Sequence, residues 1–162
     1  MWSVSSSWRA ASGGAEVSKI LTTHLTVPAS AEDVWETLID LDGYGSWNPF
    51  ITNGAGTIDV GQRLHLTMQL SDARPMTFKP WVTAVERHRY LEWLGRLGLP
   101  GLFDGRHSFT LTPLSGGRTL IQQSETFTGL LVPFTGAVLP RTRAAFDAMN
   151  QALSQRAIRL SS

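Results

Sequence analysis

The chain has 162 residues, a length that fits one domain of ordinary size built around one hydrophobic core. It carries 14 Lys and Arg residues against 13 Asp and Glu residues, a formal net charge of +1, and no long basic run, so a nucleic-acid partner is not expected. With 42% hydrophobic and 17% charged residues, the composition is typical of a globular protein and excludes a disordered or fibrous chain.

Several classes of site are excluded by what the sequence lacks. No apolar stretch reaches the roughly 18 to 20 residues that cross a bilayer, because the longest candidate, residues 129–139, contains Pro133 and Gly136. Cysteine is absent, which excludes disulfides, thiolate metal sites and a Cys nucleophile. Nucleotide-binding, metalloprotease and hydrolase motifs are missing, and residues 40–43 lack most ligands of a calcium loop. We therefore expect neither a metal nor a cofactor.

Residues 1–17 are rich in Ser, Gly and Ala and show neither a periodic apolar pattern nor the regions of a signal peptide. We expect a flexible N-terminal tail, a single domain over residues 18–162, and a cytoplasmic location. Trp2 and Trp8 are unusual in such a segment. They could dock on the domain or on a partner, although fraying is the simpler interpretation.

The first predicted elements are a strand and a short helix. Alternation with period 2 predicts a strand over residues 18–27 whose inner residues are Leu21, Leu25 and Val27. Ser30 followed by Asp33 has capping-box spacing, and an apolar face then predicts a helix that ends near residues 42–43. Residues 44–50 combine helix breakers with large aromatic residues, which favours an ordered turn that folds back on the core.

About six strand-like runs lie between residues 51 and 129 and are separated by turn residues, for example at 53–54, 71–75, 87–88, 97–101 and 115–117. The pattern is typical of an antiparallel meander. Antiparallel partners keep a constant sum of residue numbers and face the same side, so each turn predicts a register. The predicted pairs are Met68 with Phe78, Leu91 with Ala84, Trp93 with Val82 on one side and Gly105 on the other, Leu91 with His107, Phe109 with Gln123, and His107 with Glu125.

The last third of the chain changes character after residue 129. Residues 129–139 are too broken by Pro and Gly for a stable helix and too apolar for a solvent loop, which favours a flexible lip over a cavity, with a plain hydrophobic crossover as the alternative. Apolar residues then recur at helical spacing from Phe146 to Leu160, and Pro140 suits a first turn. A helix of about 30 Å, long enough to lie across the sheet, is predicted.

One inward-facing set of residues satisfies every predicted hairpin. It is mostly apolar with a few polar groups, a combination typical of a small-molecule site. The candidate ligand-binding residues are Leu66, Met68, Phe78, Val82, Leu91, Trp93, Phe103, His107, Phe109, Gln123, Glu125 and Phe127.

His107 is the only one of the four histidines predicted on this inner face, directly opposite Glu125 and one step from Gln123. A carboxylate and an imidazole with Cβ atoms about 5 Å apart can form a hydrogen bond, and such a pair can move a proton near neutral pH. His107 and Glu125 are therefore the candidate catalytic residues. Two alternatives remain open: a buried pair that holds the strand register, and a pair that orients a ligand.

The run VWETLID at residues 34–40, followed by Tyr44 and WNPF at residues 47–50, resembles the opening of the START-like, helix-grip superfamily. The resemblance is strongest to its polyketide cyclase/dehydrase and lipid-transport-like members, and it continues through FKPWV (78–82), LEW (91–93), GRHSF (105–109) and QSETFTG (123–129) to residue 160. It implies an α+β fold in which a curved antiparallel sheet wraps around a long C-terminal helix and encloses a cavity for an apolar ligand. No catalytic set of a characterised enzyme member maps onto this chain residue by residue.

The function we expect is non-covalent binding of a small hydrophobic molecule, such as a lipid, an isoprenoid or an aromatic polyketide-like compound, for transport or sequestration. The second hypothesis is a cyclase or dehydratase that uses His107 and Glu125 as acid and base. The third is a protein-interaction module that binds through the sheet or a helix face. The sequence does not define the oligomeric state.

Overall fold

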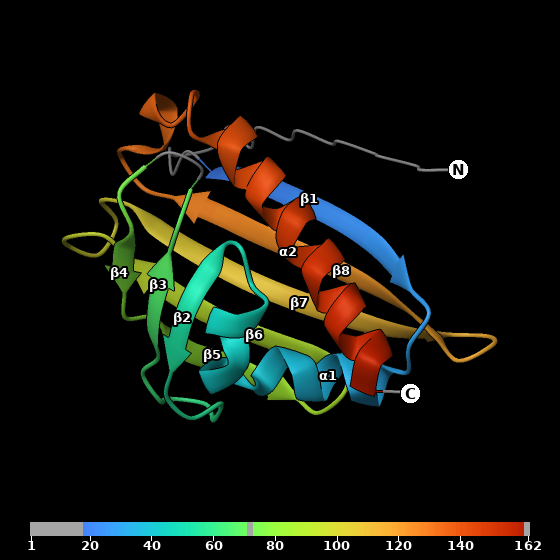
Figure 1. Cartoon of the computed structure of the whole chain (residues 1–162). Coiled ribbons are helices and arrows are strands. Elements are labelled where there is room, and N and C mark those ends of the chain that lie inside the picture. Colours follow the sequence, from blue (N-terminus) through green and yellow to red (C-terminus); the bar gives the residue numbers. More distant parts are fainter. Residues whose placement is uncertain (1–17, 71–72, 161–162) are drawn as a thin grey trace.

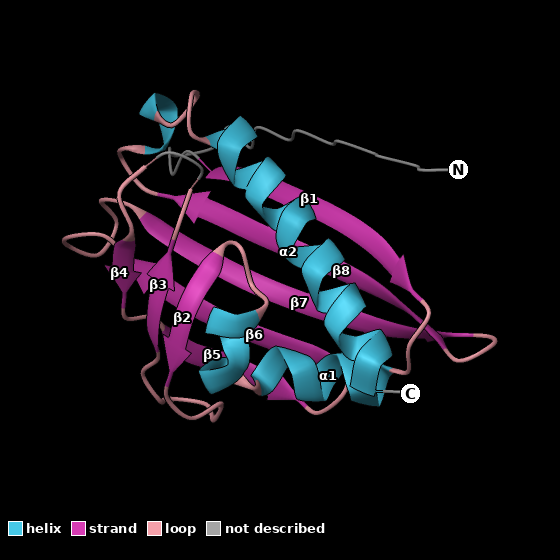
Figure 2. Ribbon diagram, in the orientation of Figure 1, coloured by secondary structure: helices cyan, strands magenta, loops and turns pink. Residues whose placement is uncertain are grey.

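The computed structural model describes residues 18–70 and 73–160, and the tail with Trp2 and Trp8 lies outside the described residues. The predicted α+β architecture of antiparallel strands and a long C-terminal helix is confirmed (Figures 1 and 2). The elements in chain order are β1 (Ser18–Val27), α1 (Ala31–Ile39), the 3₁₀ helix η1 (Leu41–Ser46), β2 (Ile51–Ala55), β3 (His65–Met68), β4 (Met76–Phe78), β5 (Trp81–Glu86), β6 (Tyr90–Arg96), β7 (Asp104–Leu114), β8 (Arg118–Thr128), the 3₁₀ helix η2 (Val132–Phe134) and α2 (Leu139–Leu160).

The strands form two sheets instead of the single predicted meander. A large sheet has the order β1-β8-β7-β6-β5, and a small sheet has the order β2-β3-β4. Figure 1 shows α2 lying diagonally across the large sheet, with α1 beside the C-terminal end of α2. The turn predicted at Asn53 and Gly54 is wrong, because both residues lie inside β2. A Cβ atom on Gly54 would lie 3.1 Å from the carbonyl oxygen of Leu41, so this glycine permits a close approach to η1 and does not mark a turn.

The connection from β1 to the small sheet is held by side-chain caps. The amide of Asp33 donates to Ser30 Oγ at 3.1 Å and Ser30 Oγ donates to the Asp33 carboxylate at 2.6 Å, so the predicted capping spacing begins α1. The hydroxyl of Tyr44, buried in the core, donates to the carbonyl oxygen of Leu38 at 2.6 Å. Asn48 Oδ1 accepts hydrogen bonds from the amides of Phe50 at 3.0 Å and Ile51 at 2.9 Å, so the ordered turn predicted at residues 44–50 is confirmed.

The register predicted for β7 and β8 is confirmed, with Phe109 opposite Gln123 and His107 opposite Glu125. The register predicted for β6 and β7 is wrong by two residues, because the strands end at Arg96 and Asp104 and leave a longer loop than expected. Trp93 therefore lies opposite His107, not Gly105, and Leu91 lies opposite Phe109, not His107. A shift of two residues keeps every side chain on its face.

Two other hairpins also differ from the predicted register, β3–β4 by two residues and β5–β6 by one residue. Met68 pairs with Met76 and not with Phe78, because the β3–β4 connection is also longer than predicted. Leu91 lies opposite Val85 and not Ala84, because the turn contains three residues, 87–89, where two were predicted. A β-bulge between Val82 and Ala84 then restores the predicted pairing of Val82 with Trp93.

Helix α2 buries one face against the sheet, as its periodicity predicts. Phe146, Met149, Leu153 and Ala157 are fully buried. Leu160, predicted on the same face, is 52% exposed because Ala157 is the last residue of α2 inside the core. In the described ranges, no helix is both long and apolar enough to span a membrane.

Candidate functional site

A cavity of about 450 Å³ lies between the small sheet, the adjoining ends of β6, β7 and β8, and the segment 129–138. Its wall is almost entirely apolar and includes Phe50, Met68, Phe78, Trp93 and Phe127. The segment 129–138 contributes Leu131, Phe134, Thr135 and Val138 to the wall, and the start of α2 contributes Thr142. The predicted lip therefore lies at the cavity.

The structure divides the twelve candidate ligand-binding residues into two sets. Those on the cavity wall are Met68, Phe78, Trp93, Phe103, Glu125 and Phe127. Those in the packed core, away from the wall, are Leu66, Val82, Leu91, His107, Phe109 and Gln123. The second set therefore does not lie on the wall of this cavity.

For the polar members of the second set, His107 and Gln123, the space above the sheet is filled by α2. The Phe146 ring lies 4.9 Å from the His107 ring, and the Gln123 amide donates to Met149 Sδ at 3.6 Å. Side chains of α2 thus occupy the half of the sheet that the inward-facing pattern alone would leave open. The sequence could not show this boundary, because both sets share one face of the same strands.

Sequence reasoning missed several residues of the wall, including Phe50, Pro80, Leu97 and the paired glycines Gly95 and Gly105. The two glycines carried a signal, because Gly95 is two residues from Trp93 and Gly105 is two residues from His107, so both share the inward face. A glycine inside a strand often marks a place where another group approaches closely. A Cβ atom on Gly105 would lie 2.5 Å from Glu125 Oε1, whereas a Cβ atom on Gly95 would have no neighbour closer than 3.9 Å. Gly105 therefore leaves room for the Glu125 carboxylate.

The polar candidates form one continuous hydrogen-bonded line that starts at the cavity wall. Glu125 Oε2 lies 3.1 Å from His107 Nδ1, and His107 Nε2 lies 3.1 Å from Gln123 Nε2. An amide NH₂ only donates, so in this arrangement His107 Nε2 accepts and Nδ1 carries the proton that is donated to Glu125. Gln123 Oε1 has no hydrogen-bond partner among the described residues. If the amide were rotated by 180°, Oε1 would face His107 Nε2 and could accept a hydrogen bond from an imidazole that is protonated on both nitrogens.

Aromatic rings hold His107 in place from several sides. The Trp93 ring stacks on it with centroids 4.9 Å apart and planes at 12°, and the Phe109 ring lies at the same centroid distance. The His107 side chain is 1% exposed, whereas that of Glu125 is 15% exposed. Glu125 is therefore the only member of the line that a molecule in the cavity could touch, and His107 acts on such a molecule only through Glu125.

A second polar cluster lies on the outer face of the large sheet, away from the cavity. Glu92 accepts hydrogen bonds from Tyr90 at 2.6 Å, from Thr83 at 2.7 Å and from Arg106. Burial favours the neutral acid, but these hydrogen bonds and the charge of Arg106 outweigh it and hold the pKa of Glu92 below its ordinary value. The cluster ties β5, β6 and β7 together and contributes nothing to the cavity wall.

No set of three or more His, Asp or Glu side chains that could hold a metal ion occurs in residues 18–70 and 73–160. The polar part of the cavity wall is one carboxylate, the Thr135 and Thr142 side chains, and Arg74. The arrangement can hold an apolar molecule and offer it a hydrogen-bond acceptor or a carboxylic acid at one place.

Comparison with known proteins identifies one family. The family described as "Polyketide cyclase / dehydrase and lipid transport" matches residues 19–157. No curated protein sequence matches the chain.

Solved structures share the fold at low sequence identity. A norcoclaurine synthase point mutant from Thalictrum flavum, in complex with a transition-state analogue, has a TM-score of 0.72 and 19% identity over 93% of this chain and 100% of that chain. A START superfamily protein from Mycobacterium smegmatis has a TM-score of 0.70 and 21% identity, covering 87% and 98%. The Zhui aromatase/cyclase from Streptomyces sp. R1128 has a TM-score of 0.65 and 18% identity, covering 90% and 96%. These likenesses establish the helix-grip, START-like fold.

Proposed function

Because the chain belongs to the polyketide cyclase/dehydrase and lipid transport family, we propose that its cavity binds a small hydrophobic molecule non-covalently. The observation that carries this proposal is the cavity of about 450 Å³ with its apolar wall. Pockets for small molecules usually measure roughly 300 to 1,000 Å³ and combine apolar walls with a few polar groups. A collapsed interior would instead have favoured a protein-interaction module.

The wall chemistry narrows the class of ligand. Trp93, Phe103 and Phe127 offer aromatic surfaces, and the Phe103 and Phe127 rings stack with centroids 5.6 Å apart. Burial of a flat apolar body against them would supply affinity at about 25 cal/mol per Å². Glu125 Oε2 is engaged by His107, while Oε1 has no hydrogen-bond partner among the described residues. A ligand with an apolar or aromatic body and one hydroxyl or amine donor fits this wall best.

Native mass spectrometry of the purified full chain, followed by organic extraction, tests the proposal. We expect a retained apolar species at one copy per chain, or one-to-one uptake of a neutral aromatic probe such as N-phenyl-1-naphthylamine. This probe carries a single N–H donor on two aromatic groups and is smaller than the cavity. A protein that retains no apolar species and also fails to take up the probe would contradict ligand binding.

A second candidate function is a cyclase or dehydratase reaction on a carbonyl compound. It is favoured by one observation, the carboxylate of Glu125 on an apolar wall with an imidazole 3.1 Å behind it. In this reaction Glu125 would be the acid or base that touches the substrate, and His107 would be a positioning residue that orients the Glu125 carboxylate through their hydrogen bond. The solved relatives whose names state an aromatase/cyclase activity support the same class of substrate.

The substitution Glu125→Gln separates the two functions. Gln preserves size and one acceptor, so a carrier should keep its fold and most of its affinity, with a loss of about 1 to 3 kcal/mol. An enzyme should keep its binding and lose about a hundredfold or more in turnover. If Glu125→Gln and His107→Gln both unfold the chain while the wild type carries no ligand, the pair is purely structural and both functional proposals for it fail.

A further inference from the structure

The cavity wall carries two charged side chains of opposite sign, Glu125 on β8 and Arg74 in the connection between β3 and β4. Strand β8 belongs to the large sheet, whereas β3 and β4 belong to the small sheet. The cavity lies between these two sheets. A molecule that contacts both charged groups therefore reaches from one sheet to the other.

The two threonines of the wall have already used their donors. Thr135 Oγ1 donates to the carbonyl oxygen of Val132 at 2.7 Å, and Thr142 Oγ1 donates to that of Val138 at 3.1 Å. These hydroxyls can still accept a hydrogen bond, but each has spent its one hydrogen. A negatively charged group on a ligand therefore has to find its donor elsewhere on the wall.

Arg74 is the cationic side chain of this wall, and it has no partner in the described part of the chain. It is exposed and forms neither a hydrogen bond nor an ion pair with a described residue. A side chain that borders a cavity and is also exposed lies where the cavity meets solvent. The guanidinium fork donates two parallel hydrogen bonds to an oxygen pair, as in a carboxylate or a phosphate.

Glu125 offers the complementary group on the other sheet. Its side chain is only 15% exposed, and its Oε2 atom is engaged by His107. The Oε1 atom has no hydrogen-bond partner among the described residues, so it accepts from an N–H or O–H group of a ligand. The two charged groups thus call for opposite chemistry, an anion at Arg74 and a donor at Glu125.

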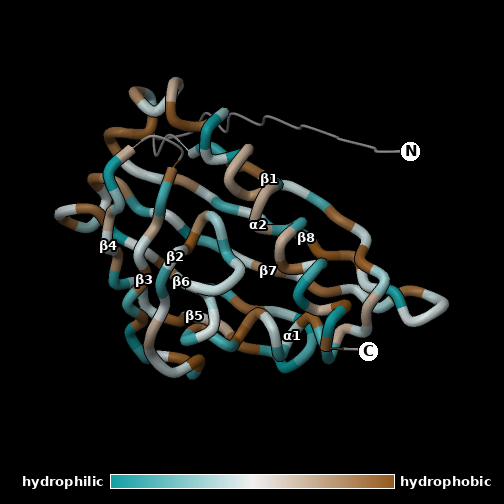
Figure 3. Tube along the Cα trace, in the orientation of Figure 1, coloured by the Kyte–Doolittle hydropathy of each residue, from teal (hydrophilic) through white to brown (hydrophobic). Residues whose placement is uncertain are grey.

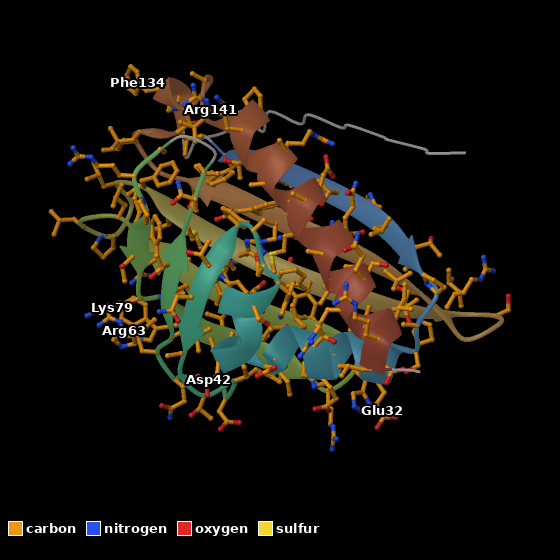
Figure 4. All side chains as sticks on the ribbon, viewed as in Figure 1. Glu32, Asp42, Arg63, Lys79, Phe134 and Arg141 are labelled. Carbon is orange, nitrogen blue, oxygen red and sulfur yellow. The ribbon has the colours of Figure 1, made fainter. Side chains whose placement is uncertain are left out.

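The remainder of the solvent-exposed part of the wall is apolar. Met76, Leu97, Phe134 and Val138 belong to the wall and are between 46% and 82% exposed. Figure 3 shows that segment 129–138 is largely hydrophobic, and Figure 4 shows Phe134 pointing outward. An anionic group held at this side of the cavity therefore has Arg74 as its charged partner on the wall.

We propose that the ligand of this cavity is an amphipathic anion whose carboxylate, phosphate or similar oxygen-acid group binds Arg74. Its apolar or aromatic body fills the cavity, and its hydroxyl or amine group donates to Glu125. This inference rests on the proposed function and deepens it, because it assigns a charge to the ligand and a specificity-determining role to Arg74.

Two fluorescent probes that differ by one anionic group test the inference on the full chain. The anionic probe is 6-(p-toluidino)-2-naphthalenesulfonate, and the neutral probe is N-(p-tolyl)-2-naphthylamine, the same molecule without its sulfonate. The N–H group and the sulfonate lie at opposite ends of the naphthalene. A change that affects only the sulfonate probe therefore reports on the contact with the anion.

The two proteins compared with the wild type are Arg74→Gln and the matched control Arg141→Gln. Each substitution removes one positive charge from an exposed side chain. Arg141 precedes the wall residue Thr142 but is not itself part of the wall, and Figure 4 shows Arg141 at the same end of the molecule as Phe134. The control therefore measures any long-range attraction of the anion without the direct contact. Far-UV circular dichroism checks that both variants keep the fold.

We expect Arg74→Gln to lower the affinity for the sulfonate at least about fivefold and to leave the affinity for the neutral probe within about twofold. Arg141→Gln should leave both affinities within about twofold. If Arg74→Gln binds the sulfonate as tightly as the wild type, or if Arg141→Gln weakens it equally, the inference is overturned while the proposed function stands. A wild type that binds the neutral probe but not the sulfonate has the same meaning. A wild type that binds neither probe overturns the inference and the proposed function together.

Discussion

The substitution Gly105→Ala would test the position of the Glu125 carboxylate without altering Glu125 or His107. The added Cβ atom would lie 2.5 Å from Glu125 Oε1, a separation that real Cβ atoms do not sustain, so one group has to move. Glu125 has the flexible end and should swing away from His107. The hydrogen bond of 3.1 Å between Oε2 and Nδ1 would then be lost while the backbone stays in place.

The structure supplies a matched control at Gly95, the cross-strand partner of Gly105 on the same cavity wall. Gly95→Ala adds the same methyl group with no neighbour closer than 3.9 Å. Both variants should gain about 0.5 to 1 kcal/mol from the lower entropy of the unfolded chain. Only Gly105→Ala should lose the charge-assisted hydrogen bond. Since the displaced carboxylate can reach water in the cavity, we expect the lost hydrogen bond to lower the free energy of unfolding by about 1 to 2 kcal/mol.

Urea unfolding of the two variants measures this difference directly. The free energy of unfolding of Gly105→Ala should lie about 1 to 2 kcal/mol below that of Gly95→Ala, a factor of about 5 to 30 in the folding equilibrium. The ¹⁵N NMR signals of the His107 ring should change in Gly105→Ala and stay as in the wild type in Gly95→Ala. Equal stability together with unchanged His107 signals in both variants would refute the position assigned to the carboxylate.

Three further predictions concern the frame around the cavity. The pKa of Glu92 is lowered on folding, so the carboxylate stabilises the fold above its unfolded pKa of about 4.3, and this contribution is lost below that pH. The free energy of unfolding in urea should therefore be higher for the wild type than for Glu92→Gln at pH about 6, and the difference should shrink as the pH falls to about 3. Tyr44→Phe leaves the buried carbonyl of Leu38 without its 2.6 Å donor and should lower the free energy of unfolding by about 1 to 3 kcal/mol, and no loss would contradict the assignment. Gly129→Ala, at φ +120° and with its Cβ atom 2.6 Å from the Leu102 carbonyl oxygen, should lower the thermal midpoint by several degrees, and an unchanged midpoint would contradict the packing of segment 129–138 on the β6–β7 loop.

Local patterns in the sequence predicted those features that depend on neighbouring residues. The cap at Ser30, the extent of α2 and the pairing of His107 with Glu125 each follow from spacing along one or two elements. The inward and outward faces also survive the two-residue errors in register, whereas the one-residue error in β5–β6 places Ala84 opposite Glu92 and not opposite Leu91. A slip of two residues, as between Trp93 and its partner in β7, leaves every face unchanged.

Features that depend on packing between distant elements were not predictable in this way. The sequence pattern assigned His107 and Glu125 to one face, but it did not show that Phe146 seals the histidine while the carboxylate reaches the cavity. The division into two sheets was not predictable for a similar reason. Gly54 resembles a turn residue in the sequence, but it lies inside β2, where its lack of a side chain allows the close contact with Leu41 of η1. The end of the cavity is thus decided by α2 and by segment 129–138, not by the strands that form its wall.

The cavity itself is tested most directly by a fluorescence titration with N-phenyl-1-naphthylamine on three proteins. In Gly95→Phe a ring projects from the wall into the cavity, whereas in Leu94→Phe the ring lies on the opposite face of the same strand. We expect the wild type and Leu94→Phe to bind one probe molecule per chain with similar affinity, and Gly95→Phe to bind at least tenfold more weakly with its fold intact. Equal affinity of Gly95→Phe and the wild type would contradict the claim that this cavity is the binding site.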